Sequence, residues 1–183
     1  MDDKKPVSME ALFEKKASEQ MISEGNQFKT VARGVYILRA TKYDATEDPK
    51  QVNSLGGPRT NINFSVDICD DQGNRKAKAF VRVSPDEGRT VNGYLDGKSK
   101  LYAQLTKALG LGVGGEQPSA GEVVQTFMQT PVKGFVGLQF KSLTPDPITG
   151  KGIYVDPKTE AEEADCRKKG YTPQNSVLSI QKA

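Results

Sequence analysis

The sequence predicts a mainly β protein with added helices, of the α+β class, built around a small curved barrel. Residues 60–69 and 75–83 alternate between apolar and polar side chains, the period-two pattern of strands with one face on a core. Residues 34–43 are rich in β-branched and aromatic side chains, with apolar groups on both faces, as in a strand of a small barrel. Glycine and proline are frequent and apolar residues make up 36% of the chain, which favours long loops around a compact sheet.

The two alternating segments form a predicted hairpin with a basic outer face. The turn comes from the polar residues 70–74, which include Gly73. On the return strand, alanine and valine take the core face, and the outer face holds Lys76, Lys78, Phe80 and Arg82. Binding of a single-stranded nucleic acid requires cations beside the phosphates and a ring on which a base can stack. The alternative is that Phe80 closes a small core or a subunit contact, with the cations as a solvated edge that discourages aggregation.

A second predicted strand, over residues 131–141, repeats this composition. One face would hold Val132, Val136, Leu138 and Phe140, and the other would hold Lys133, Phe135, Gln139 and Lys141. Gly134 and Gly137 allow tight bending of the strand or close approach of a ligand backbone. Two separate strands with cations and a phenylalanine opposite the core favour the binding hypothesis more than either strand does alone.

The chain divides into three predicted segments. Residues 1–32 hold an amphipathic helix at 8–22 and a linker, residues 33–156 hold the barrel, and residues 157–183 hold a charged segment and a closing edge strand at 176–180. The first helix would dock on its own fold, on a neighbouring subunit or on a replication partner. Residues 44–59 are predicted to be a long loop, either a binding loop or disordered. Further helices are predicted at 99–109, with Ser99 as its cap, at 119–129 and at 159–169, and a short strand at 153–155.

Charge and composition narrow the function classes. The net charge is +3, and residues 31–83 hold nine basic and six acidic residues, so the positive surplus lies on predicted strands and suits a polyanion. The absence of histidine removes histidine-based triads and the usual zinc hydrolases, so we expect no enzyme, no cofactor and no metal site. Two distant cysteines and a charged start predict an intracellular, soluble protein without membrane contact.

The order of elements is strand, long loop, hairpin, helix, strand, hairpin tip and strand. With the segments GVYILRATKYDA, KLYAQLTKALGLG and PVKGFVGLQF, this order resembles the phage-encoded single-stranded DNA-binding proteins of the oligonucleotide/oligosaccharide-binding (OB) fold. The resemblance covers about residues 33–156 and implies a five-stranded barrel with a helix between strands three and four. It also implies that strands two and three, with the loops after strands one and four, form the nucleic-acid face. Carried over to this sequence, it nominates Tyr43, Arg59, Lys76, Lys78, Phe80, Arg82, Lys133, Phe135 and Lys141.

The resemblance further implies a function and a setting. The protein would bind single-stranded DNA with little sequence preference, in phage DNA replication or recombination. It would act as a homo-oligomer beside replication or recombination proteins, in the cytoplasm of an infected bacterial host cell.

Two other function classes stay open. A phage-encoded interaction module that binds or inhibits a host protein would use the first helix and the long loops. A metal-dependent nuclease would place magnesium on carboxylates such as Asp67, Asp70 and Asp71, or Asp44, Glu47 and Asp48. These acidic residues are more simply explained as turn and loop residues.

Overall fold

The computed structural model describes residues 29–53, 55–85, 90–91 and 94–183. The helix predicted at 8–22 lies outside this part of the chain. In chain order the elements are β1 (Gly34–Val52), β2 (Pro58–Cys69), β3 (Arg75–Val83), β4 (Thr90–Val91), β5 (Tyr94–Leu95), α2 (Gly97–Ala108), α3 (Ala120–Gln129), β6 (Val132–Lys141), β7 (Tyr154–Val155), α4 (Glu160–Lys168) and β8 (Thr172–Gln181).

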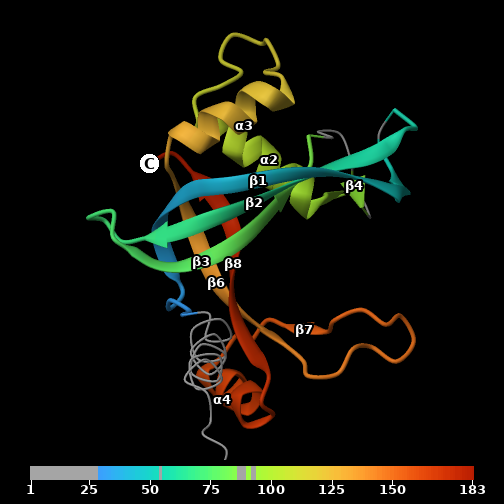
Figure 1. Cartoon of the computed structure of the whole chain (residues 1–183), viewed down its shortest axis with the longest axis vertical. Coiled ribbons are helices and arrows are strands. Elements are labelled where there is room, and N and C mark those ends of the chain that lie inside the picture. The colour runs from blue at the N-terminus through green and yellow to red at the C-terminus, as the bar shows by residue number, and fades with distance from the viewer. Residues whose placement is uncertain (1–28, 54, 86–89, 92–93) are drawn as a thin grey trace, which may run out of the picture.

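Six of these strands form one antiparallel sheet, so the protein is mainly β with added helices, as predicted (Figure 1). The hydrogen-bonded order runs β3-β2-β1-β6-β7, and β8 pairs with β6. β8 pairs with β6 from Lys133 to Lys141, while β1 pairs with residues 132–136 of the same strand. β7 therefore continues along the edge of β6 that β1 occupies, beside Phe140 and Lys141.

The hydrogen bonds between the described strands leave the sheet open. β3 forms a ladder with β2 and β8 forms one with β6, but no ladder joins β3 to β8 among the described residues. The two strands nevertheless lie beside each other, and α2 contacts both. The sheet is thus strongly curved, with a helix at the place where its two ends approach.

Period-two alternation builds the main core. β2 contributes Ile62, Phe64, Val66 and Ile68, and β3 contributes Ala77, Ala79, Val81 and Val83, all of them buried. Helices α2 and α3 cover this core with Leu105, Val123 and Phe127, and the rings of Phe64 and Phe127 meet edge to face at a centroid distance of 4.9 Å. An edge-to-face pair of this kind adds to the stability gained by burial.

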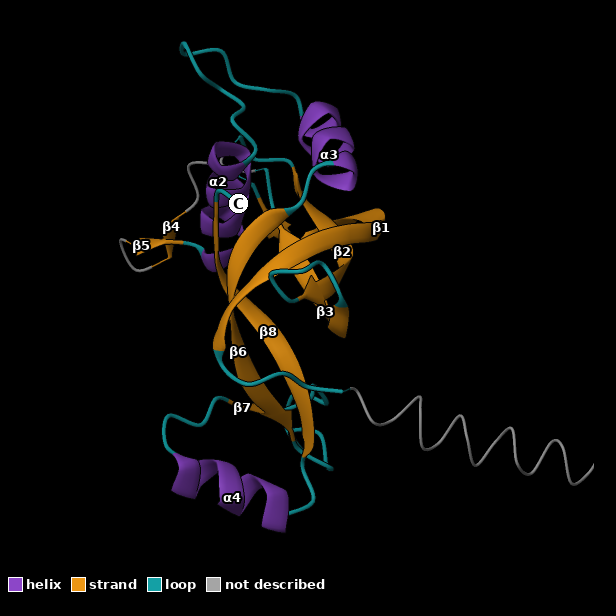
Figure 2. Ribbon diagram, turned by 90° about the vertical axis from the view of Figure 1, so that its left-hand side faces the viewer, coloured by secondary structure: helices purple, strands orange, loops and turns teal. Residues whose placement is uncertain are grey.

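A smaller core lies at the other end of the sheet. Figure 2 shows α2 and α3 at one end of the strands and α4 at the other. Leu138 and Phe140 of β6 pack against Cys166 of α4, and the Arg167 guanidinium lies 5.4 Å from the centroid of the Phe140 ring. α4 begins as predicted, because the Thr159 hydroxyl accepts the backbone N–H of Glu162. None of the described helices is long and apolar enough to cross a membrane.

The prediction of a long loop at 44–59 is wrong. β1 runs to Val52 and β2 begins at Pro58, so the described residues of this range form a two-stranded arm with a short turn. In this turn the Asn53 side-chain oxygen accepts the backbone N–H groups of Leu55 and Gly57, at 3.0 and 2.9 Å. Pro49 falls where the β1–β2 ladder is irregular, between Asp48 and Val52, so it breaks no regular pairing.

The predicted cap of the helix after β3 is also corrected. α2 begins at Gly97, and the carboxylate of Asp96 accepts the backbone N–H groups of Lys98 and Ser99. An aspartate at this position satisfies donors that the first helical turn leaves unpaired. Ser99 lies inside the first turn, and its side chain is buried.

Replacing Gly134 with alanine is expected to lower the free energy of unfolding by about 1–3 kcal/mol, the usual cost of overpacking a core. A Cβ there would lie 2.4 Å from Cδ1 of the fully buried Leu38 and 3.1 Å from the Ser179 carbonyl oxygen. Urea denaturation measures the change. The matched control is Gly121→Ala in α3, where the nearest atom would be 3.9 Å away, and there we expect no loss. Equal stability of the two variants would contradict the packing around Gly134.

Candidate nucleic-acid interface

Strand register places a basic surface on the outer face of β1, β2 and β3, the face turned away from the main core. Residues directly opposite each other in an antiparallel pair share a face. The register gives three rows across the strands: Arg39, Asp67 and Lys78; Lys42, Ser65 and Phe80; and Asp44, Asn63 and Arg82. Arg39, Lys42, Lys78, Phe80 and Arg82 are exposed. We call this surface the basic face.

The four residues predicted on β3 all lie at this face or its end. Phe80 is 73% exposed, so its ring is open to solvent. Lys76 sits at an irregularity of the β2–β3 ladder and forms an ion pair with Asp70 at 3.0 Å. Partial desolvation works against the Asp70 charge, but hydrogen bonds from the Asn74 backbone N–H and the Lys76 ammonium keep its pKa below the usual value.

A groove opens beside the basic face, between β3 and the far end of the sheet. Its volume is about 660 Å³, and it is lined by Asp44, Asn63, Phe80, Val81, Arg82, Gln139, Tyr154 and Gln174. Tyr154 is 52% exposed, so the described residues that line the groove include two accessible rings, Phe80 and Tyr154, together with the Arg82 guanidinium. The described lining of the groove therefore combines stacking surfaces, a guanidinium, a carboxylate and several amide groups.

Only some of the residues predicted on β6 lie near this groove. Lys141 is exposed and pairs with Tyr154, so it lies at the border of the groove. Lys133 and Phe135 are not among the lining residues, and they lie further along β6 beside Ile37 and Val35. Phe135 is 38% exposed there. Gln139, on the same face as Lys141, is the β6 residue that reaches the groove.

Tyr43 is not on the basic face. In the β1–β2 ladder it lies opposite Phe64, a core residue, and the two rings are 6.3 Å apart. Strict alternation from Leu38 and Ala40 would turn Tyr43 outward. The ladder passes from Ala40 directly to Lys42, so Thr41 is an extra residue that reverses the faces of everything after it. The same bulge brings Lys42 onto the basic face.

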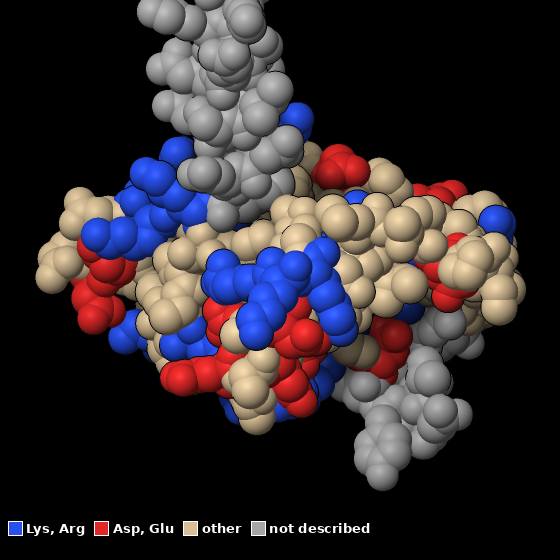
Figure 3. All heavy atoms as spheres, turned by 90° about the horizontal axis from the view of Figure 1, so that it is seen from below, with Lys and Arg blue, Asp and Glu red and all other residues tan. Residues whose placement is uncertain are grey.

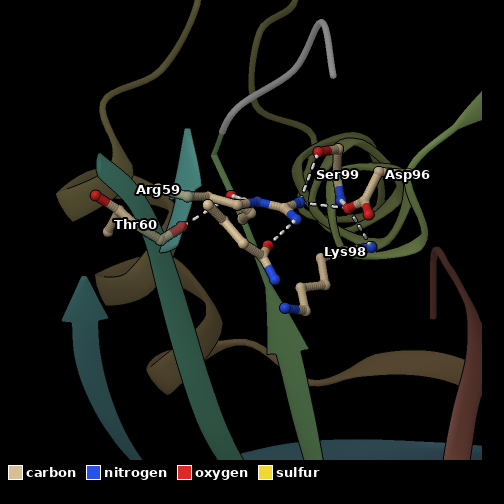
Figure 4. A network of polar contacts seen from close by, with 7 residues as sticks. Arg59, Thr60, Asp96, Lys98 and Ser99 are labelled. Carbon is tan, nitrogen blue, oxygen red and sulfur yellow. Dashed lines mark hydrogen bonds and ion pairs between the residues drawn. The ribbon is translucent and has the colours of Figure 1, made fainter. Parts of the chain in front are cut away.

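Arg59 is buried, with 1% of its surface exposed, and this corrects its assignment to the nucleic-acid surface. Figure 4 shows its guanidinium directed at the start of α2, where it forms an ion pair with Asp96 and donates to Ser99. It also donates to the side chains of Ser84 and Gln51, both at 3.1 Å. With its donors engaged inside the protein, Arg59 holds the base of the arm to α2.

The sequence reasoning missed Arg39 and Lys42 of the basic face, and it did not nominate the groove residues Asp44, Asn63, Gln139, Tyr154 and Gln174 for binding. Arg39 and Lys42 lie on a segment that was predicted as a strand, but only the register with β2 shows which face they share. Tyr154 lies on the predicted strand at 153–155, and only its pairing with Lys141 brings it to the groove.

The charges of the basic face differ from those at the far end of the molecule. Arg39, Lys42, Lys78 and Arg82 share the three rows with two carboxylates, Asp44 and Asp67. Around α4, by contrast, basic and acidic side chains are interleaved (Figure 3) and pair with each other, as Arg167 does with Glu163 and Lys169 with Asp165. In the part of the chain that the structure describes, no three acidic or cysteine side chains form a group that could hold a metal ion.

No family model, curated protein or solved structure matches the chain.

Proposed function

We propose that the protein binds single-stranded DNA with little sequence preference, through the basic face and the adjoining groove. The observation that carries this proposal is the pair of exposed rings, Phe80 and Tyr154, in one groove with Arg82. A soluble protein has little reason to expose two rings beside a row of cations unless something flat and negatively charged covers them.

The chemistry of a single strand fits this surface. Its bases are unpaired and can stack on aromatic rings, and its phosphates attract lysine and arginine. Stacking contributes on the order of 1–3 kcal/mol per base, without choosing between bases. Arg39, Lys42 and Lys78 would follow the phosphates across the sheet, and Phe80 would hold a base at the mouth of the groove.

The strand order supports an OB-like barrel, which we propose as the architecture. β1, β2 and β3 form a consecutive meander, α2 follows β3 after the short β4–β5 pair, and β6 returns to pair with β1, as in the five-stranded fold. β8 would take the place of the fifth strand, since it pairs with β6 and lies beside β3. In this barrel β2 and β3 carry the ligand face, where Phe80 and Arg82 are found.

We place this activity in phage DNA replication or recombination, in the cytoplasm of an infected bacterial cell, beside the proteins of those processes. A homo-oligomer suits the role, because neighbouring copies of the protein would bind side by side along one DNA strand.

One observation favours a second candidate, an interaction module that binds or inhibits a host protein. Val35, Phe135 and Leu178 are exposed on neighbouring strands away from the groove, and a Cβ on Gly137 would lie 2.7 Å from Leu178, so Leu178 covers that glycine. A protein partner or a second copy would cover such an apolar surface. The single-strand titration described below separates the two candidates.

The salt dependence of binding tests the proposed surface. We expect Lys78→Glu to weaken binding of a fluorescent 15-nucleotide oligothymidylate and to reduce the slope of log K against log salt by about 0.7, the value for one lost phosphate contact. Lys168→Glu makes the same charge change on α4, which packs against Leu138 and Phe140 on the face of β6 opposite Gln139 of the groove, and it should leave the slope unchanged. Fluorescence anisotropy between about 50 and 200 mM salt gives both slopes. Equal slopes for the two variants would remove Lys78 from the site.

A further inference from the structure

A polar row crosses the basic face at the groove. Asp44, Asn63 and Arg82 lie opposite one another on β1, β2 and β3, and all three line the groove. The Arg82 Nε donates to the Asn63 side-chain oxygen at 2.5 Å, and the Asn63 amide nitrogen donates to Asp44 Oδ2 at 3.3 Å. Asn63 is therefore hydrogen-bonded to a guanidinium on one side and to a carboxylate on the other. The backbones of Arg82 and Asp44 are about two strand spacings, or roughly 10 Å, apart.

Both charged groups keep free hydrogen-bonding atoms. Among the described residues, no partner contacts the terminal nitrogens of Arg82 or the Oδ1 atom of Asp44. The groove thus offers paired donors and a carboxylate acceptor side by side, with Phe80 and Tyr154 available for stacking. Such an arrangement can read the edge of a base that stacks between the strands.

The pairing of a guanidinium with a carboxylate selects one base. Guanine presents two acceptors, O6 and N7, that match an arginine bidentately, and its N1–H and 2-amino groups are two donors that match a carboxylate. Adenine offers one amino donor and no O6 acceptor. Cytosine offers one amino donor, and thymine offers a single N–H between two carbonyls. Only guanine can engage both charged groups through paired bonds.

We propose that this row is a guanine subsite, so that the groove prefers guanine at one position of an otherwise unselective strand. Arg82 donates to O6 and N7, Asp44 accepts from N1–H and the 2-amino group, and Asn63 fixes the two side chains. The proposal rests on the proposed function, because the guanine is part of a bound single strand.

Base analogues test the proposal on the unmodified protein. The probes are fluorescent 15-nucleotide oligothymidylates whose central base is guanine, hypoxanthine, 7-deazaguanine, adenine or cytosine. Hypoxanthine lacks the 2-amino group and 7-deazaguanine lacks the N7 acceptor. We expect the guanine probe to bind about tenfold more tightly than the adenine and cytosine probes, with an intermediate affinity for both analogues.

A matched pair of variants assigns the contact. Asp44→Asn should abolish the difference between guanine and hypoxanthine while keeping that between guanine and 7-deazaguanine. Glu47→Gln makes the same charge change on β1, opposite Thr60 of β2, outside the groove, and should keep both differences. Equal affinity for all probes would overturn the guanine subsite and leave the proposed function standing. Failure of every probe to bind would overturn the proposed function and the subsite with it.

Discussion

Replacing Asp96 with alanine is expected to lower the free energy of unfolding by about 3 kcal/mol, because it leaves the buried charge of Arg59 without its carboxylate partner. Arg59 is 1% exposed, and Asp96 is its only carboxylate partner among the described residues. Removing one member of a buried pair costs more than the pair itself contributes, since the remaining ion cannot recover its hydration. The variant also removes the cap of α2, which accepts the N–H groups of Lys98 and Ser99.

Urea denaturation measures this change, and the control is an exposed ion pair. Asp165→Ala removes the partner of Lys169 on α4, where both side chains are more than half exposed, so the loss should be below about 1 kcal/mol. The double variant Arg59→Met with Asp96→Ala should be more stable than Asp96→Ala alone, because it leaves no unpaired ion. A loss equal to that of Asp165→Ala would show that the Arg59 network is not buried in solution.

The same pair makes stability depend on pH. Burial pushes the pKa of Asp96 upward, but the hydrogen bonds and charge of Arg59 and the backbone N–H groups of α2 outweigh it, so the pKa lies below its usual value. A carboxyl with a depressed pKa in the folded state stabilises the protein above its unfolded pKa of about 4, and this contribution is lost as the pH falls through the folded pKa. Asp96→Ala should therefore flatten the loss of stability on acidification.

The variants Phe80→Ala and Tyr154→Ala are each expected to weaken single-strand binding about 5- to 150-fold, the equivalent of about 1–3 kcal/mol of stacking. Both rings are more than half exposed, so their removal should change the free energy of unfolding by less than about 0.5 kcal/mol. Anisotropy titrations with oligothymidylate at constant salt measure the affinity, and urea denaturation checks the folding.

Phe135→Ala is the matched control for the two groove rings. Phe135 is a partly exposed phenylalanine on an adjoining part of the sheet, and it was nominated with Phe80 from the sequence. Because it lies outside the groove, its removal should leave the affinity unchanged. If Phe135→Ala weakens binding while Phe80→Ala does not, the bound DNA follows the outer face of β1 and β6 instead.

Local patterns predicted much of the fold because they report local physics. The alternation in 60–69 and 75–83 forms the β2–β3 hairpin, and the helices predicted at 119–129 and 159–169 are α3 and α4. The arm formed by β1 and β2 was missed because its residues are polar on both faces. Its stability comes from pairing with the partner strand, which leaves no periodic signal.

The site was harder to predict because it depends on register and on distant segments. One extra residue, Thr41, moves Tyr43 to the core face and Lys42 to the basic face. Arg59 looks like a surface cation in the sequence, and only the position of α2 shows that it is buried. The groove joins Phe80 to Tyr154, which are far apart in the chain, so no window of sequence contains both.

Titration of a fluorescent 15-nucleotide oligothymidylate with the full chain, at about 50 mM salt, is the measurement that tests the proposed activity most directly. Binding that unlabelled oligothymidylate competes away, and that an equal mass of duplex DNA does not, is the result predicted for a groove that stacks unpaired bases between Phe80 and Tyr154. No rise in anisotropy at this salt concentration, or equal competition by duplex, would contradict a single-strand site on this face.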